Sequence, residues 1–363
     1  MIGMGAEEEI KRIEEEIRRT PYNKATQKHI GILKSKLAKL REKQSKPSGR
    51  KSMGYGIRKA GDATVVIVGF PSVGKSSLLN RLTSAESKIG DFDFTTIKVI
   101  PGVMEYNSAK IQVLDVPGVI EGVSRGRGRG REVLSVVRIA DLLIIMADSR
   151  KPGQLGIIQR ELYESGFRLN QKPPNISVKK RFGGGVDVTV SQRFSISRET
   201  IRSILQEFRI LNAEVVVRED VSPDQLIDCI MGNRVYVPAV SVFNKTDLVG
   251  EEELDSLMKR YPDCVFISAE NGKNLGILRK RIWERLGLMR VYMKRAGKEP
   301  DMKEPVIMPR GSRVKDVAEK IHRDVFGAKV RYARIWGRTA RFPGQKRGKE
   351  TILQDGDVVE LHA

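Results

Sequence analysis

An eight-residue stretch with two glycines and a lysine most strongly limits the folds open to this chain of 363 residues. It reads Gly-Phe-Pro-Ser-Val-Gly-Lys-Ser over residues 69–76, between an apolar run and a helix-like run that begins at Ser77. In such a strand–loop–helix the glycines let the backbone wrap a chain of phosphates, with N–H groups and the helix N-terminus pointing at the anion. The stretch predicts a phosphate-binding loop in an α/β domain.

The residues of this loop have separate expected roles. Lys75 would reach the β- and γ-phosphates as a catalytic residue, and the Ser76 hydroxyl would hold Mg²⁺. The other residues expected to bind the nucleotide here are Gly69, Pro71, Ser72, Val73, Gly74 and Ser77. The alternative is an ordinary strand-to-helix turn, but chance matches seldom fall between a strand and a helix.

Length and composition narrow the class of protein. The chain can form two or three domains, and its apolar fraction of 40% is ordinary for a soluble protein. It has no long uncharged apolar run, and charges begin at Glu7, so we expect a cytoplasmic protein without a membrane partner. Cys229 and Cys264 are isolated and the histidines are scattered, which argues against a disulfide or a Cys/His metal site.

Positive charge is concentrated at the two ends of the chain. The net charge is +21, of which residues 1–60 carry +9 and residues 290–363 carry +8. Lys and Arg that neutralise phosphates release counterions, so this segregation favours RNA as the partner of both ends. A generally basic, solvated surface is the alternative.

Hydrophobic spacing divides the chain into parts. Residues 6–20 and 24–45 predict a helical hairpin within a basic N-terminal region and linker, residues 1–60. From residue 61 strands and helices alternate, which is typical of a mostly parallel sheet covered on both faces. The expected strands are 64–68, 97–105, 110–115, 142–147, 239–244 and 264–268, and the expected helices are 75–83, 132–139 and 275–286.

The interval of about 90 residues between Ala147 and Ala239 is too long for an ordinary crossover. Strands over 186–190 and 213–217, with helices over 198–208 and 223–231, predict an inserted α/β subdomain. We therefore expect the α/β domain to cover 61–168 and 237–289, with the insertion at 169–236. Residues 290–363 contain a helix over 314–325 among strand-like runs, which predicts a compact β-grasp module.

Further motifs complete a nucleotide site. Asp115 ends a strand and would hold Mg²⁺ through water, and the Gly118 N–H would meet the γ-phosphate. Thr96 would close on the metal when the γ-phosphate is present, as a switch, so we assign Thr96 and Gly118 to the catalytic set. Each motif lies at a strand end, where ligands of open α/β sheets bind.

The base is predicted from Asn-Lys-Thr-Asp at residues 244–247. The Asp247 carboxylate can accept from guanine N1–H and its 2-amino group, whereas adenine lacks that amino group. Asn244 would bond the far edge of the base and tie loops together, and the Lys245 stem would pack over the ring. Ser268, Ala269 and Glu270 follow the next strand, where the Ala269 N–H would meet guanine O6.

Several longer motifs resemble one family. They are Asp-Phe-Thr-Thr at 93–96, Pro-Gly-Val-Ile-Glu-Gly at 117–122, Gly-Arg-Gly-Arg-Gly-Arg at 126–131, Lys-Pro-Pro-Asn-Ile at 172–176 and Gly-Asn-Arg-Val-Tyr at 232–236. With the phosphate loop they resemble the developmentally regulated GTP-binding proteins, in the Obg-like branch of the translation-factor-related GTPases. The resemblance covers essentially the whole chain.

The resemblance implies an N-terminal helical region, a GTPase domain, an insertion similar to the second domain of a small-subunit ribosomal protein, and a C-terminal TGS domain. It also implies a role on the ribosome and a dedicated regulatory protein partner. Val119 stands where many GTPases place a water-orienting glutamine, so intrinsic hydrolysis should be slow. Ser72 stands where some relatives have a K⁺-holding asparagine, which leaves K⁺ stimulation open.

Three functions follow as hypotheses. The leading one is a Mg²⁺-dependent, monomeric GTPase switch that acts on the ribosome and binds RNA through its basic ends. The alternatives are an RNA-binding scaffold with structural GTP and negligible turnover, and a ribosome assembly GTPase. The segment 125–131 could supply a transition-state arginine, contact RNA or form a solvated loop.

Overall fold

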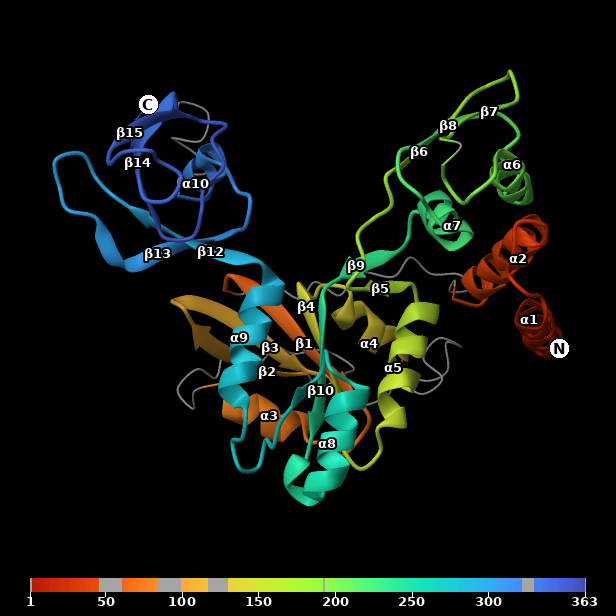
Figure 1. Ribbon diagram of the computed structural model, residues 1–363, viewed down its shortest axis with the longest axis horizontal. Helices are drawn as coiled ribbons and strands as arrows, with labels where there is room; N and C mark the ends of the chain where they lie inside the picture. The colour runs from red at the N-terminus through yellow and green to blue at the C-terminus, as the bar shows by residue number, and fades with distance from the viewer. Residues whose placement is uncertain are drawn as a thin grey trace. The chain divides into compact units, whose positions relative to one another are not determined.

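The computed structural model describes residues 2–45, 61–83, 99–116, 130–191, 193–321 and 330–362. Contacts divide the chain into two compact units. The first comprises Met1–Tyr55, Glu121–Leu134 and Gln159–Val237, and the second comprises Gly56–Ile120, Ser135–Ile158 and Pro238–Ala363. Figure 1 gives the element labels used below.

The second unit is built on a six-stranded sheet. Its strands stand in the order β11-β10-β4-β1-β3-β2, and every adjacent pair is parallel except β2 with β3. The strands are β1 Ala63–Gly69, β2 Ile100–Tyr106, β3 Ala109–Asp115, β4 Leu142–Asp148, β10 Ala239–Asn244 and β11 Val265–Phe266. Its helices are α3 Lys75–Leu82, η2 Thr246–Leu248, α8 Glu251–Arg260 and α9 Leu275–Leu286, and the residues of α4 Gly130–Val137 and of α5 Gly153–Glu164 are divided between the two units.

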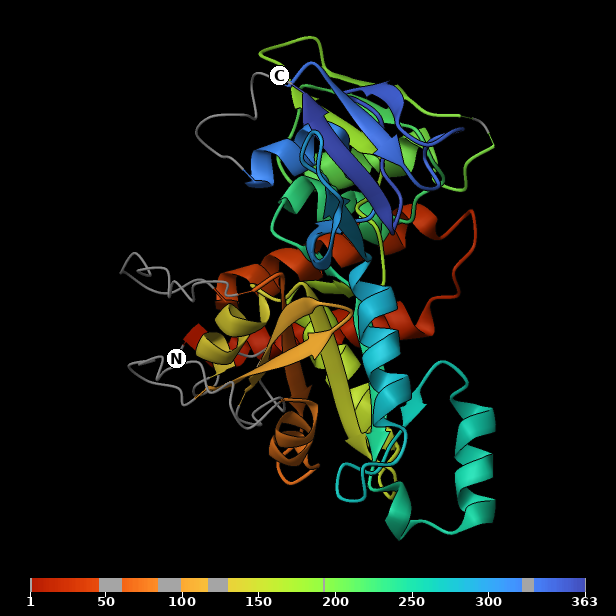
Figure 2. The ribbon, with the colours of Figure 1, turned by 90° about the vertical axis from the view of Figure 1, so that its left-hand side faces the viewer.

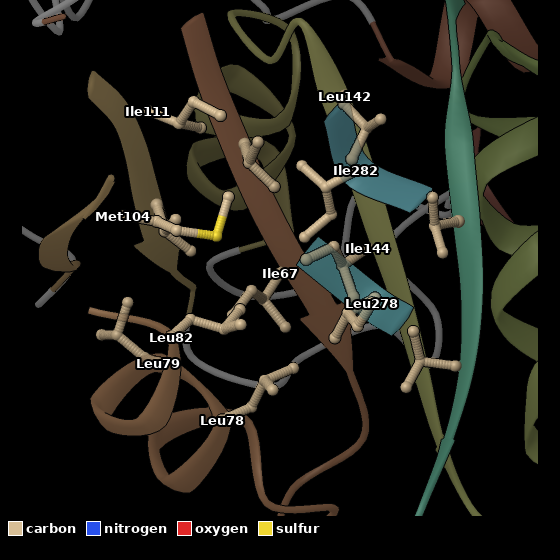
Figure 3. Packing of buried hydrophobic residues seen from close by; sticks show 14 of the residues in the cluster. Ile67, Leu78, Leu79, Leu82, Met104, Ile111, Leu142, Ile144, Leu278 and Ile282 are labelled. Carbon is tan, nitrogen blue, oxygen red and sulfur yellow. The ribbon is translucent and has the colours of Figure 1, made fainter. Parts of the chain in front are cut away.

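Apolar residues bury both faces of this sheet, as is typical of parallel strands. On one face, Leu78 and Leu82 of α3 and Leu278 of α9 pack against strand residues such as Ile67 and Ile144 (Figure 3). The helix spacing of these leucines places them on one side of each helix. Their burial fixes α3, and with it the loop that precedes α3, against the carboxyl end of β1.

The described residues between 288 and 362 form a five-stranded sheet and one helix. The strands are β12 Leu288–Met293, β13 Asp301–Pro309, β14 Tyr332–Trp336, β15 Gln345–Gly348 and β16 Asp357–His362, in the order β13-β12-β16-β14-β15. The central pair, β12 and β16, is parallel, and α10 Val314–Ile321 packs on the sheet through Val314, Val317 and Ala318. This confirms the expected β-grasp module, and the expected helix residues 322–325 lie outside the described residues.

The first unit combines the N-terminal hairpin with the inserted segment. Its elements are α1 Ile2–Arg19, α2 Gln27–Ser45, β5 Phe167–Leu169, β6 Ile176–Lys180, β7 Val186–Thr189, α6 Arg198–Glu207, β8 Ala213–Val217, α7 Pro223–Met231 and β9 Val235–Val237. β6, β8 and β7 form a three-stranded sheet, and β5 pairs with β9. Ser197 and Ser222 cap α6 and α7 by accepting backbone N–H groups, so the local sequence sets both helix starts.

Helix α2 docks on α6 through a glycine and a buried amide. A Cβ on Gly31 would lie 3.2 Å from the Ile204 side chain, so the helices approach closely there. Gln27 donates to the Ser195 carbonyl (2.9 Å) and accepts from the Thr200 hydroxyl (3.2 Å). Figures 1 and 2 show α1 and α2 side by side, and Arg41 of α2 bonds Glu14 of α1 at 2.7 Å. The hairpin is therefore part of the inserted segment's packing.

Pairing within this unit reduces the positive face expected for α2. Lys34 pairs with Asp224, Lys39 pairs with Glu207, and Arg41 also pairs with Glu164. Lys28 and Lys36 remain exposed. Part of the N-terminal charge therefore holds the unit together and does not face solvent freely.

One strand is shorter than expected. The sequence predicts a strand over 264–268, but β11 covers only Val265–Phe266, and Ser268 forms an isolated bridge with Lys273. Its partner β10 ends at Asn244, where Lys245 turns to φ 65°, so the regular pairing ends at Phe243 with Phe266.

Candidate nucleotide-binding site

The phosphate loop has the backbone geometry that the sequence predicts. It joins β1 to α3, with Ser72 at φ 59° and Gly74 at φ 95°. A Cβ on Gly74 would lie 2.4 Å from Asn244 Nδ2, and one on Gly69 would lie 2.6 Å from the Met146 carbonyl oxygen. Both positions therefore require glycine. Pro71, Ser76 and Ser77 are exposed, and Val73 is buried beneath the loop.

Lys75 curls back over the loop. Its Nζ donates to the carbonyl oxygens of Gly69 (3.2 Å) and Phe70 (3.1 Å). Burial lowers the pKa of Lys75, although Asp115 partly opposes this shift. A buried ammonium group at the N-terminus of α3 is suited to an anionic ligand.

Asp115 and Ser76 meet beside Lys75. The Ser76 hydroxyl donates to Asp115 Oδ2 at 2.6 Å, and Asp115 Oδ1 is buried and has no hydrogen-bond partner among the described residues. Burial raises the pKa of Asp115, and the bond from Ser76 and the charge of Lys75 only partly oppose that shift. The Ser76 hydroxyl and the two oxygens of the Asp115 carboxylate are oxygen donors of the kind that Mg²⁺ takes, so these residues fit the ion. Among the described residues no cluster of three His, Cys, Asp or Glu side chains could form another metal site.

Asn244 connects the phosphate loop to the base-side loops. Its Nδ2 donates to the Val73 carbonyl at 2.9 Å, and its Oδ1 accepts from the Ala269 N–H at 2.9 Å. The predicted role in tying loops together therefore has a direct geometric counterpart. The Ala269 N–H, expected to meet guanine O6, is bonded to Asn244 here.

Other base-side residues lie at the carboxyl ends of β10 and β11. Asp247 is exposed, as a residue that reads a ligand must be. The Ser268 hydroxyl accepts from the Asn271 N–H at 3.2 Å and so holds the turn that contains Ala269 and Glu270.

Lys245 lies across the phosphate loop in a left-handed conformation, φ 65°. Its Nζ donates to the Ser72 carbonyl at 2.6 Å and lies 3.1 Å from Asp148 Oδ2. This arrangement stretches the Lys245 stem between two fixed acceptors. A stem held in this way can present an apolar surface to a purine ring.

Asp148 is a site residue that the motifs did not single out. Its carboxylate is 5% exposed and accepts bonds from Arg150 Nε (3.0 Å), Arg150 Nη2 (2.7 Å) and Lys245. The bonds from Arg150, followed by those from Lys245, hold the pKa of Asp148 well below its usual range, although burial opposes them. Its position at the carboxyl end of β4 could have identified it, but the expected strand ended one residue earlier, at Ala147.

Three predicted features lie outside the described residues. They are Thr96, Gly118 and residues 125–129 of the arginine-rich segment, whose last two residues, Gly130 and Arg131, begin α4. The structure therefore assembles the phosphate loop, Asp115 and the base-side loops in one place, while the expected switch residues stay predictions.

Taken together, the fold and the site define a nucleotide-binding α/β protein of the phosphate-loop class. The family described as "50S ribosome-binding GTPase" matches residues 64–180, "C-terminal region of MMR_HSR1 domain" matches 183–288, and "TGS domain" matches 289–363. An uncharacterised GTP-binding protein of Methanocaldococcus jannaschii is 50% identical over 99% of this chain and 93% of its own length. Developmentally-regulated GTP-binding protein 2 of Homo sapiens is 43% identical over 99% of each chain.

The chain therefore belongs to the developmentally regulated GTP-binding protein family, with a GTPase domain and a C-terminal TGS domain. Among solved structures, the YchF GTPase of Schizosaccharomyces pombe matches with a TM-score of 0.47 and 13% identity, over 84% of this chain and 99% of that one. Across the described parts of the chain, no helix combines the length and the apolar character needed to cross a membrane.

Proposed function

We propose that this protein is a Mg²⁺-dependent GTPase switch that acts on the ribosome in the cytoplasm. The observation that carries the proposal is the hydrogen bond of Ser76 to Asp115 next to Lys75, with one buried carboxylate oxygen that no described residue contacts by a hydrogen bond. A carboxylate that is desolvated in this way is costly unless a ligand uses it. The expected ligand is the metal that accompanies a triphosphate.

Each site residue has a role in this proposal. Ser76 and Asp115 would hold Mg²⁺, with Thr96 joining them in the GTP state, and the ion neutralises charge on the phosphate oxygens when bound. Lys75 would leave the carbonyls of Gly69 and Phe70 for the β- and γ-phosphates. The Gly118 N–H would meet the γ-phosphate.

Hydrolysis should be slow without help. Val119 has no group that can orient water, so we expect stimulation by the ribosome or by a dedicated regulatory protein. A K⁺ ion could also supply positive charge near Ser72, although Ser72 is not the asparagine that this mechanism uses in relatives. Measuring GTP turnover in K⁺ and in Na⁺ tests whether K⁺ stimulates hydrolysis.

Ribosome binding is assigned to the basic ends. The family description "50S ribosome-binding GTPase" supports a ribosomal partner. The net charge of +8 on residues 290–363 supports an RNA contact, and residues 1–60 contribute less than their +9 suggests because several α2 cations are paired. We expect the protein to act as a monomer.

Turnover measurements test the proposal against a scaffold that holds GTP structurally. GTP hydrolysis would be measured with and without ribosomes, and with Lys75→Ala as the inactive control. Stimulation of the wild type by ribosomes supports the switch, whereas equal and negligible turnover under every condition supports the scaffold. A ribosome assembly GTPase would crosslink to precursor particles in preference to mature ones.

A further inference from the structure

The connection between β6 and β7 presents an aromatic side chain completely to solvent. Phe182 is 110% exposed, and Leu211, which leads into β8, is 63% exposed. Figure 1 shows this connection projecting beyond the end of the three-stranded sheet, β6-β8-β7. Burying a phenylalanine stabilises a protein by roughly 1.5–3 kcal/mol, which is available to a partner that covers Phe182.

The loop that carries Phe182 is anchored at both ends. The Arg181 N–H donates to the Asn212 carbonyl at 3.0 Å, and the Gly185 N–H donates to Asn212 Oδ1 at 2.9 Å. Arg181 also pairs with Glu214 at 2.8 Å. Because Asn212 follows Leu211 directly, the same anchor places Phe182 and Leu211 at one end of the sheet.

Three glycines follow Phe182 and leave the backbone open. A Cβ at Gly183, Gly184 or Gly185 would meet no atom of the described residues within 4 Å, and the last two have φ values of 89° and 74°. Since no side chain shields this backbone, a second chain can approach it closely. The loop therefore combines a fixed base, an exposed ring and an accessible main chain.

Positive charge surrounds this tip. Lys179, Lys180 and Arg181 precede Phe182, and Arg209 lies two residues before Leu211. Arg181 is paired with Glu214, whereas Lys180 and Arg209 are exposed and form no ion pair with the residues that the structure describes. Exposed cations that lie within two residues of Phe182 and of Leu211 in the sequence match a backbone of phosphates, and the exposed ring matches a base that stacks.

We propose that this tip, residues 179–185 with Arg209 and Leu211, binds single-stranded RNA. Phe182 stacks on a base, and Lys180 and Arg209 contact the flanking phosphates. This site is separate from the basic ends and adds an RNA contact in the middle of the chain. A lipid surface fits less well, because one Phe and one Leu offer less apolar area than a single acyl chain, which already binds membranes only marginally.

The test measures binding of the full chain to an oligouridine of about 12 nucleotides, a length that suits a single-stranded site. Phe182→Ala should weaken binding by about 5- to 100-fold, the range expected from losing one stacked base. Phe182→Trp should retain binding, because it keeps the ring. Ile277→Ala, which removes another exposed apolar side chain (56%) from α9, is the control and should change nothing.

Two further arms separate the contributions. Lys180→Gln should reduce the slope of log affinity against log salt by about 0.7, the value for one phosphate contact on a single strand. GTP turnover of Phe182→Ala should equal that of the wild type, so a failure here is distinct from a failure of the proposed switch. The proposal is overturned if Phe182→Ala binds RNA within twofold of the wild type, or if it loses binding only to phosphatidylserine vesicles.

Discussion

At the scale of single residues, the site holds buried ionisable groups whose charged forms are unfavourable until a ligand neutralises them. Within the described parts of the chain one oxygen of the buried Asp115 has no hydrogen-bond partner, and burial raises the pKa of this carboxyl group. Lys75 is also buried, with a lowered pKa. Both shifts disfavour the charged forms in the nucleotide-free protein, which is the usual condition of a site organised for function and not for stability.

Asp115→Asn should therefore stabilise the nucleotide-free protein while damaging its function. Burial disfavours the charged form of this carboxyl group, so the neutral amide should raise the free energy of unfolding by about 1 kcal/mol. Nucleotide binding should lose its dependence on Mg²⁺ at the same time. Thermal unfolding without nucleotide, and GTP titrations with Mg²⁺ or EDTA, measure the two effects. A lower melting temperature for the variant would contradict this reading of Asp115.

Asp148 should support both stability and nucleotide affinity by holding Lys245. Removing a charge-assisted hydrogen bond costs about 1.5–3 kcal/mol, so Asp148→Asn should weaken GTP and GDP binding alike by about 10-fold or more. Asp187→Asn, at an exposed position on β7, is the control. Equal affinities for Asp148→Asn and the wild type would show that Lys245 needs no such support.

The same residue gives a pH dependence with a defined sign. Because the folded-state pKa of Asp148 is depressed, its stabilising contribution is complete above the ordinary value of 3.8 and is lost as the pH falls below it. The stability gap between the wild type and Asp148→Asn should thus be full at pH 7 and should narrow in acid. Denaturant titrations at several pH values measure it, and a gap that widens in acid would contradict the assignment.

At the scale of elements, the N-terminal hairpin is the part whose role is least visible from sequence. The periodic leucines and isoleucines predict two helices, and both are present. Their docking on α6 depends on Gly31 and Gln27, whose partners are far away in the chain.

Deleting residues 2–45 should therefore uncover Ile204 and lower the melting temperature of the first unit, while GTP affinity stays unchanged. Limited proteolysis should then cut the 169–236 segment, and resistance equal to that of the wild type would contradict the packing.

Local patterns predicted much of the second unit. Helix α9 has the expected bounds, Leu275–Leu286, and β10 has the expected bounds, Ala239–Asn244, because each has a strong apolar period and a clear end. Helix α8, Glu251–Arg260, was missed because only Leu257 is buried among its charged residues. The long strand β13 shows little apolar pattern at its start, because its first four residues are exposed and three of them are charged.

The sequence allowed candidate site residues to be chosen, whereas it did not give the strand order of the sheet that holds them. Phosphate-loop and base-side motifs carry their own chemistry, so Lys75, Ser76, Asp115 and Asn244 could be chosen before the strand order was known. The order β11-β10-β4-β1-β3-β2 follows from long-range pairing, which no local pattern encodes. Asp148 joins the site only because β4 lies beside β10, where Asp148 pairs with Asn244.

At the scale of the whole molecule, we expect ribosome binding to depend both on the basic charge of the chain and on the bound nucleotide. Removing residues 290–363, which carry +8, should weaken RNA binding and reduce its salt dependence by about 0.9 per lost contact to duplex phosphates. GTP affinity should be unaffected, since the nucleotide site uses no residue of that segment. Unchanged RNA binding and salt slope after this truncation would contradict the charge argument.

The most direct test of the central claim is co-sedimentation of the full chain with ribosomes in the presence of a non-hydrolysable GTP analogue, of GDP or of no nucleotide. The wild type should sediment most strongly with the analogue, because the γ-phosphate is expected to order Thr96 and Gly118. Lys75→Ala should lose that difference. Identical sedimentation of the wild type in all three conditions would contradict the switch.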